Sequence, residues 1–228
     1  PQFPKKHKGF NTFFQQLLQR LKKEHPAEQY IKKAASLGVT NDSGPLNYFV
    51  PHEAEVPYAD IPAAHHAGYL VLTPHITETQ LWPLHLLHQL AASINHPIII
   101  IGNKSEYAFA GKDAAVDNIK IYNACGKFSV HENADLIRKA KLVVAAQSYF
   151  VQTAAAFQKE LVWIQAEDRV TPYYGTVFLK KGTAPPFDTI KLPKKFLEPR
   201  NEAVVASEEN QFINEITGAI NKPLQRKA

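Results

Sequence analysis

A glycine, a lysine and a serine lie close together in the segment Gly126-Lys127-Phe128-Ser129, which directly follows a short apolar run. A glycine lets the backbone turn sharply, a lysine supplies a positive charge, and a hydroxyl can bond to phosphate or ribose. Ser148, at the start of a later predicted helix, is a second candidate for such a contact. The structural alternatives are a plain strand-to-helix turn at 126–129, which the local pattern favours, and a helix N-cap at Ser148.

His75 is the residue with which we would test proton transfer, because imidazole titrates near neutral pH. An ordinary loop histidine is the alternative. The pair His65-His66 sits in a loop with no nearby carboxylate constellation, and His85 and His88 lack the His-x-x-x-His spacing of two ligands on one helix face, so no metal site is predicted. Cys125 borders the 126–129 segment without a base placed beside it, which is weak support for thiol chemistry.

The charge of the chain indicates what kinds of partner it could have. The 228 residues contain 26 Lys and Arg and 21 Asp and Glu, a net charge of +5, and the basic residues are clustered. Such clusters suit a phosphate-bearing ligand, nucleic acid or an anionic membrane surface, and solvated surface lysines are the alternative. No zinc-finger spacing and no aromatic-basic RNA motif occurs, so we predict no nucleic-acid partner.

Composition also bears on location. No apolar run approaches the ~18 residues of a membrane span, and no signal-peptide pattern opens the chain, so a cytoplasmic protein is predicted. Because the chain starts at Pro1 and contains no methionine, we expect either a fragment of a longer protein or a sequence from which modified methionines are missing.

Five short apolar runs alternate with helical patterns and predict the elements that must position these residues. Runs that are apolar throughout are typical of strands buried on both faces, so we predict an α/β fold, a Rossmann-like parallel sheet with helices on both faces. The predicted strands are Tyr69–Leu72, Pro97–Ile101, Ile119–Tyr122, Leu142–Ala145 and Leu161–Ile164. The helices between them are Pro83–Ile94, Ser105–Ala115, His131–Ala140 and Phe150–Phe157.

The flanking segments complete the predicted organisation. We predict two domains: residues 1–67, with N-terminal helices and a long surface connector, and residues 68–228, with the sheet, an irregular extension and a final helix. The further elements are helices over Asn11–Lys23 and Ala27–Leu37, the second stopped by Gly38, a connector over residues 40–67 with no packed element, and a last helix capped by Ser207.

In an open parallel sheet, ligands bind at the carboxyl ends of the strands, next to the point where the strand order reverses. The loops at that edge are Thr73–Trp82, Gly102–Glu106, Asn123–Ser129 and Ala146–Phe150, with a fifth after Gln165. The dinucleotide pattern Gly-x-Gly-x-x-Gly and the P-loop pattern are both absent. We therefore predict no bound cofactor of the NAD or ATP kind.

Three segments in order resemble one family. The stretches Asn118–Ser129, Ala134–Val144 and Thr153–Phe157 are similar to the ADP-heptose:lipopolysaccharide heptosyltransferases, and the likeness extends over about Glu28 to Gly175. That family has the GT-B fold, two Rossmann-like halves with a cleft between them. The resemblance implies that this chain corresponds to the C-terminal half, which binds the nucleotide-sugar.

By position, the resemblance implies a set of donor contacts. They are Thr73, Gly102, Glu106, Gly126, Lys127 and Ser129. Two departures stand out. The family motif Asp-Thr-Gly-x-x-His at the helix that holds the pyrophosphate is replaced by Gln147–Gln152, with Tyr149 in place of glycine, and the first loop contains no Lys or Arg between Thr77 and Trp82. These changes imply altered or lost donor binding.

Three functions follow as hypotheses. The first is a heptosyltransferase-type glycosyltransferase of the bacterial cytoplasm, which uses an ADP-sugar and needs an N-terminal acceptor-binding half in cis or in trans for cell-envelope polysaccharide or lipopolysaccharide synthesis. The second is a catalytically inactive binding or assembly module on the same fold. The third is a basic peripheral protein at an anionic membrane surface, for example on the inner membrane.

Overall fold

The computed structural model describes residues 26–40, 47–76, 80–106, 120–146, 148–166, 187–192 and 202–225. The chain divides into two compact units, Pro1–Gly44 and Pro45–Ala228. In the first unit, α2 (Pro26–Ala34) continues as a 3-10 turn, Ala35–Leu37, and stops at Gly38, whose φ is +82°. A proline at the first helical position and a left-handed glycine at the end are the expected signals, so this predicted helix is confirmed.

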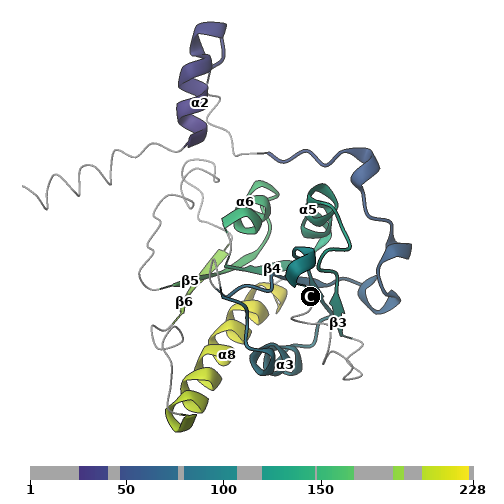
Figure 1. Cartoon of the computed structure of the whole chain (residues 1–228), viewed down its shortest axis with the longest axis vertical. Helices are drawn as coiled ribbons and strands as arrows, with labels where there is room; N and C mark the ends of the chain where they lie inside the picture. The colour runs from purple at the N-terminus through teal and green to yellow at the C-terminus, as the bar shows by residue number, and fades with distance from the viewer. Residues whose placement is uncertain are drawn as a thin grey trace, which may run out of the picture. The chain divides into compact units, whose positions relative to one another are not determined.

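The second unit is built on a six-stranded sheet with the order β3-β2-β1-β4-β5-β6, in which every neighbouring pair is parallel (Figure 1). The central strands β1 and β4 are buried along their whole length, as their continuous apolar runs predict. The strands are β1 (Leu70–Leu72), β2 (Ile98–Ile100), β3 (Ile121–Asn123), β4 (Leu142–Ala145), β5 (Leu161–Ala166) and β6 (Phe187–Leu192).

The sixth strand was not expected, because the chain after Gln165 was predicted to be irregular. All six residues of β6 pair with β5, from Phe187 opposite Leu161 to Leu192 opposite Ala166. Apolar and polar residues alternate over its second part, residues 189–192, and Ile190 and Leu192 are buried. Prolines on both sides of this segment hide the pattern in the sequence, and an edge strand tolerates such neighbours.

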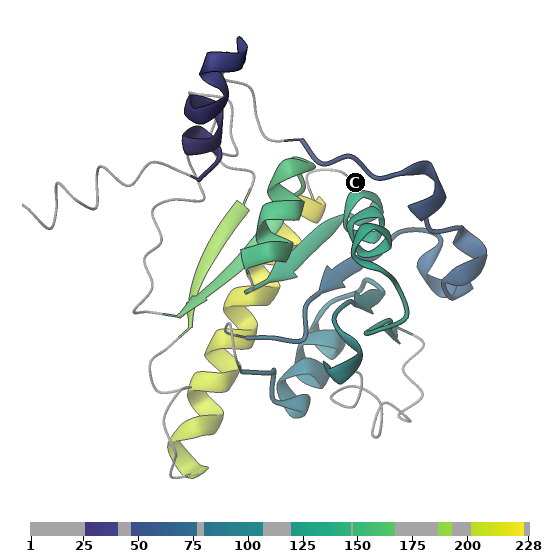
Figure 2. The same cartoon turned by 45° about the horizontal axis from the view of Figure 1, so that its top comes forward.

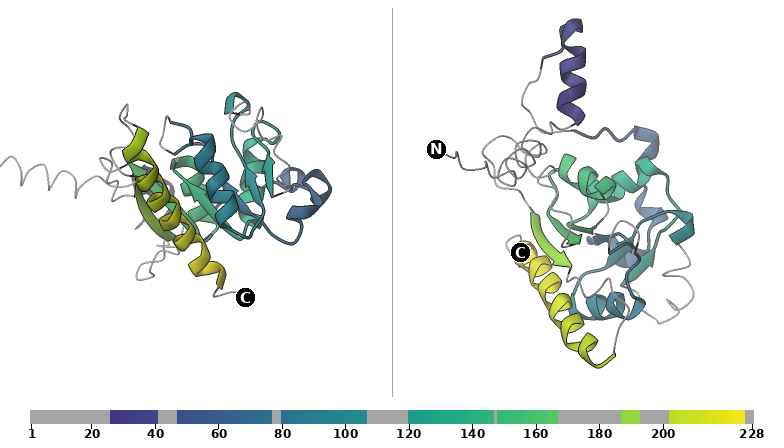
Figure 3. Two further views of the ribbon diagram at one scale, coloured as in Figure 1. Left: turned by 90° about the horizontal axis from the view of Figure 1, so that it is seen from below. Right: turned by 60° about the vertical axis from the view of Figure 1, so that its left-hand side comes forward.

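The helices cover both faces of the sheet. Figures 1 and 2 show α5 (Val130–Lys139) and α6 (Ser148–Ala156) on one face, and α3 (Leu84–Ser93) and α8 (Glu202–Gln225) on the other. Figure 3 shows α8 running beside β6. The two-sided α/β architecture is therefore confirmed.

Ser207 was expected to cap the last helix, and that prediction is wrong. The helix α8 begins five residues earlier, at Glu202, because residues 202–206 contain neither glycine nor proline and an acidic residue is favourable at a helix start. The helix predicted over Asn11–Lys23 lies outside the described residues. So does most of the one predicted over Ser105–Ala115, of which the described part is the end of a 3-10 turn, Lys104–Glu106.

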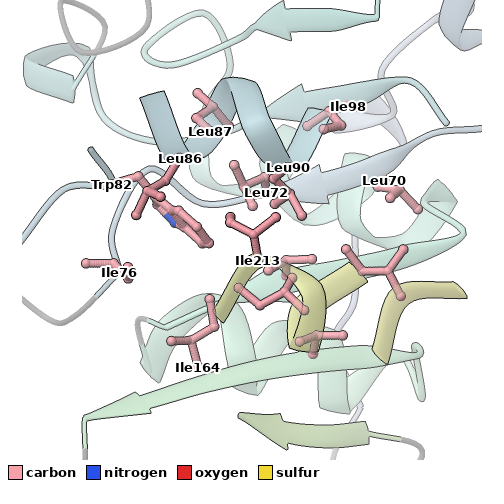
Figure 4. Close-up of a cluster of buried hydrophobic side chains, with 14 of the residues drawn as sticks. Leu70, Leu72, Ile76, Trp82, Leu86, Leu87, Leu90, Ile98, Ile164 and Ile213 are labelled. Carbon is pink, nitrogen blue, oxygen red and sulfur yellow. The ribbon is translucent and has the colours of Figure 1, made fainter. Parts of the chain in front are cut away.

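Two apolar cores lie on the two faces of the sheet. On one face, strand side chains such as Leu72 and Val144 pack against α3 and α8, where the tilted rings of Trp82 and Phe212 have their centroids 6.0 Å apart. Figure 4 shows the Trp82 ring lying close to Leu86, in the same cluster as Ile213. On the other face, Val71 and Val143 pack against α5 and α6.

The connector at residues 47–67 contributes to the second core, which corrects the prediction that it contains no packed element. It forms 3-10 turns at His52–Ala54, Tyr58–Asp60 and Ala63–His65, and it places Val56 and Ile61 in the core. The apolar side chains of a long polar-looking segment thus cover α5 and the strands beneath it.

A buried carboxylate fixes this connector to α5. Asp135 is fully buried and accepts hydrogen bonds from the Val56 N–H (2.8 Å), from Lys139 (2.6 Å) and from Arg138 (2.6 and 2.8 Å). Burial alone would raise the pKa of Asp135, but these hydrogen bonds outweigh it, so that its pKa lies below its ordinary value. We call Asp135, Arg138, Lys139 and Val56 the Asp135 clamp.

Among the residues that the structure describes, no helix is both long enough and apolar enough to cross a bilayer.

Candidate functional site

The strand order reverses between β1 and β4, so the carboxyl ends of these two strands mark the place where a doubly wound sheet binds its ligand. Thr73 directly follows β1, and its N–H donates to the carbonyl of Val144 in β4 (3.1 Å). The Thr73 hydroxyl is completely buried and has no hydrogen-bond partner among the described residues. Because buried hydroxyls are nearly always paired, an unpaired one at this position indicates a ligand or water contact.

The loop after β1 folds back on itself. The Ile76 N–H donates to Gln80 (2.8 Å), the Trp82 N–H donates to Pro74 (2.9 Å), and His75 and Leu81 form an isolated antiparallel bridge. Ile76 and Trp82 are buried in the first core, and Trp82 Nε1 also lacks a hydrogen-bond partner in the described chain. The buried apolar side chains thus hold His75 at the carboxyl edge.

His75 faces Glu106, a residue predicted in a separate role. Its Nδ1 lies 3.6 Å from Glu106 Oε1, and the two side chains are only 12% and 10% exposed. Glu106 is itself held by Asn103, whose backbone N–H donates to Oε2 (2.8 Å) and whose side-chain amide donates to Oε1 (3.3 Å). A carboxylate held in this way can orient a neighbouring imidazole.

Two glycines let the loops after β2 and β3 approach each other, and the Gly126 N–H donates to the Gly102 carbonyl (2.8 Å). A Cβ on Gly102 would collide with the Glu106 carboxylate, and one on Gly126, whose φ is +69°, would lie 2.5 Å from the Cα of Lys104. Cys125 directly precedes Gly126. Burial, together with the nearby Glu106 carboxylate, raises the pKa of the Cys125 thiol to about 12. The thiol is therefore protonated at neutral pH.

Lys127 and Ser129 both have partners within the chain. The Lys127 ammonium lies 4.3 Å from the centroid of the Tyr122 ring. The Ser129 hydroxyl accepts from the Glu132 N–H (3.3 Å), while the Ser129 N–H donates to the Glu132 carboxylate (2.6 Å), a capping box that starts α5. The segment 126–129 therefore has the geometry of a plain strand-to-helix turn, which was the structural alternative to a phosphate or ribose contact.

The start of α6 is covered by an aromatic side chain. Ser148 is the first residue of α6, and Tyr149 follows it. The Tyr149 hydroxyl donates to the carbonyl of Val130, the first residue of α5 (3.4 Å), and burial raises the pKa of Tyr149 well above its ordinary value. Nearby, the Tyr48 hydroxyl lies 3.0 Å from His131 Nδ1. Tyr149 therefore bridges the starts of α5 and α6.

Two other histidines, His65 and His85, have partners within the fold. His65 is buried, its Nε2 lies 3.1 Å from the Ile98 carbonyl, and burial lowers its pKa. His85 lies 3.1 Å from Glu209 of α8. Within the described ranges, no group of three or more His, Cys, Asp or Glu side chains is placed to hold a metal ion.

The structure thus brings together five of the eight residues singled out from the sequence: Thr73, His75, Gly102, Glu106 and Gly126. Lys127 and Ser129 lie at the start of α5, and Ser148 lies at the start of α6. Sequence reasoning missed the contact of Tyr48 with His131, because these residues are 83 positions apart and neither belongs to a motif.

The strand order β3-β2-β1-β4-β5-β6 and the helices on both faces define a Rossmann-like α/β domain. No protein-family model and no curated protein sequence matches the chain. Solved structures do match. One is the glycosyl transferase family 9 protein from Veillonella parvula DSM 2008, with a TM-score of 0.61 and 14% identity over 90% of this chain and 61% of that one.

Two E. coli enzymes are also similar in structure. ADP-heptose lps heptosyltransferase II matches with a TM-score of 0.54 and 15% identity over 80% of this chain and 54% of that one. Heptosyltransferase WaaC with ADP matches with a TM-score of 0.51 and 21% identity over 85% and 57%. The chain therefore shares its α/β fold with glycosyltransferases of the heptosyltransferase kind, and it spans a little over half of their length.

Proposed function

We propose that this chain is a heptosyltransferase-like nucleotide-sugar-binding domain with an altered donor site, one half of a GT-B-type protein of the bacterial cytoplasm. It would serve cell-envelope polysaccharide or lipopolysaccharide synthesis together with an acceptor-binding half, in cis or in trans. The observation that carries the proposal is the fully buried Thr73 hydroxyl at the point where the strand order reverses, which has no hydrogen-bond partner among the described residues. The neighbour solved with ADP supports a nucleotide as the ligand class.

The surroundings of Thr73 suit a transfer reaction. In glycosyl transfer, an acceptor hydroxyl attacks the anomeric carbon of the sugar, the bond from that carbon to the diphosphate oxygen breaks, and a base takes the hydroxyl proton. We assign the base role to His75, with Glu106 as the group that positions it, because the two lie 3.6 Å apart in a nearly buried setting. We assign to Lys127, whose ammonium lies over the Tyr122 ring, a supporting role as a positive charge for the diphosphate.

An altered donor site is supported by the other implied contacts. Ser129 is engaged in the α5 capping box, and Tyr149 covers the space between the starts of α5 and α6. A pyrophosphate needs close backbone N–H groups, and each lost charge-assisted hydrogen bond weakens binding by about 1.5–3 kcal/mol. We therefore expect ADP to bind more weakly than about 0.1 mM.

A second function is favoured by the same tyrosine. With Tyr149 in place and no Lys or Arg in the described part of the loop after β1, the domain would act as a catalytically inactive binding or assembly module. The two functions differ in one measurable property, which is binding of a nucleoside diphosphate at the β1–β4 edge.

Isothermal titration calorimetry of the full chain with ADP and an ADP-sugar tests the proposal. We expect weak binding by the natural chain and at least about tenfold tighter binding by Tyr149→Gly, because the small residue frees the N–H groups at the start of α6. Tyr58→Gly is the matched control, since Tyr58 is an exposed connector tyrosine outside this edge, and it should bind ADP like the natural chain. Absence of heat at millimolar ADP with both the natural chain and Tyr149→Gly would reject nucleotide-sugar binding in favour of the module.

A further inference from the structure

The net charge of the chain lies entirely in its first compact unit. Residues 1–44 contain eight Lys and Arg and three Asp and Glu, whereas residues 45–228 contain 18 of each sign. The unit that carries the sheet is therefore neutral overall, and the N-terminal unit carries +5. A short segment with this excess of positive charge is attracted to a polyanionic surface.

Within that unit, α2 exposes apolar side chains next to lysine. Tyr30 in α2 and Leu37 in the 3-10 turn that continues it are 69% and 83% exposed, and their spacing of seven residues places them on roughly the same side of this helical segment. Lys33 lies on that side too, with its ammonium 5.8 Å from the centroid of the Tyr30 ring. Val39, just beyond the Gly38 stop, is also exposed.

This combination distinguishes between two polyanions. A nucleic acid would gain from the lysines but would leave Leu37 and Val39 in water. A bilayer with anionic lipids accepts both, because apolar side chains enter the acyl boundary, tyrosine rings lie at the headgroup level, and lysine ammonium groups reach the lipid phosphates.

We propose that the Pro1–Gly44 unit docks on an anionic membrane surface through the Tyr30–Lys33–Leu37 face of α2, assisted by the other basic residues of that unit. The inference rests on charge and exposure in the first unit, so its outcome is independent of nucleotide binding at the β1–β4 edge. It gives the chain a peripheral membrane attachment.

Co-sedimentation of the full chain with vesicles tests this attachment. We use phosphatidylcholine vesicles with and without about 30% phosphatidylglycerol, at ~0.1 M and ~0.5 M salt. We expect binding to the anionic vesicles alone, and weaker binding at the higher salt. The double variant Tyr30→Ser with Leu37→Ser should bind at least about fivefold more weakly, and Lys32→Glu with Lys33→Glu at least about tenfold more weakly.

The matched control is Lys141→Glu with Lys222→Glu, which changes the net charge by the same amount on exposed lysines of the second unit. It should bind within about twofold of the natural chain. The attachment is rejected if neutral vesicles bind equally well, if the α2 variants bind like the natural chain, or if the control variant is weakened as much as they are. Binding to duplex RNA without binding to anionic vesicles would also overturn it.

Discussion

Two buried polar clusters in the second unit differ in how completely they are paired. In the Asp135 clamp, both carboxylate oxygens accept hydrogen bonds from Val56, Arg138 and Lys139. At the β1–β4 edge, the Thr73 hydroxyl, His75 Nδ1 and Trp82 Nε1 are buried without a hydrogen-bond partner among the described residues. The hydrogen bonds of the first cluster stabilise the fold. The polar groups of the second could instead form hydrogen bonds with a ligand, which would contribute to its binding free energy.

The largest effect is expected from breaking the paired cluster. Asp135→Ala leaves the Lys139 ammonium and the Val56 N–H without their buried acceptor, and we expect it to lower the free energy of unfolding by about 3 kcal/mol. Urea denaturation of the full chain measures this loss. Glu55→Ala is the control, because Glu55 also pairs with Arg138 (3.3 Å) but is 45% exposed, and it should cost less than about 1 kcal/mol.

The same clamp gives a pH dependence of known sign. Because the pKa of Asp135 is lower in the folded chain than in the unfolded one, its stabilisation is complete above the unfolded pKa of about 4 and is lost as the pH falls through the folded value. The stability difference between the natural chain and Asp135→Ala should therefore shrink below about pH 4. Equal stability of Asp135→Ala and Glu55→Ala at pH 7 would show that the clamp does not hold the connector.

The two clusters also differ in what the sequence reveals about them. The strands β1, β2, β4 and β5 are predictable because continuous apolar runs specify strands buried on both faces. Asp135, in contrast, looks like a solvated charge on a helix, since its burial depends on Val56, 79 positions earlier, folding over α5.

The candidate site was predictable in its residues but not in their contacts. Thr73, His75 and Glu106 are found because the carboxyl edge of a parallel sheet collects the loops that follow its strands. The approach of His75 to Glu106 depends on how two irregular loops fold, and no local pattern encodes that. The role of Ser129 was open between phosphate contact and helix start, and the acid three residues later is the signal that favours a capping box.

A smaller loss of stability is expected from a substitution at Gly126, where the loops after β2 and β3 approach each other. Gly126→Ala requires alanine at a φ of +69° and brings its Cβ against the Lys104 backbone, so we expect a loss of about 2 kcal/mol in urea denaturation. Gly218→Ala in α8 is the matched control. Nothing lies within 4 Å of a Cβ there, so it should stabilise the chain by up to about 1 kcal/mol. If Gly126→Ala is as stable as the natural chain, the loops after β2 and β3 do not require this close approach.

The smallest effect on stability, and the sharpest test of the comparison, is expected from two buried threonines. Thr153 donates to the Tyr149 carbonyl (3.0 Å), so Thr153→Val should cost about 1 kcal/mol. Thr73→Val removes a hydroxyl with no partner in the described chain, so its stability should change by less than about 0.5 kcal/mol or increase.

For ADP binding, we expect the reverse ranking of the two threonine variants, with the larger loss for Thr73→Val. Because the Thr73 hydroxyl has no partner among the described residues and lies at the proposed ligand-binding edge, Thr73→Val should weaken ADP binding by about tenfold or more, while Thr153→Val leaves it within about twofold. If Thr73→Val costs as much stability as Thr153→Val and leaves ADP binding unchanged, the Thr73 hydroxyl has a structural partner and the β1–β4 edge is not reserved for a ligand. A Thr73→Val protein of unchanged stability with weakened ADP binding would instead show that the Thr73 hydroxyl contributes to binding and not to the stability of the fold.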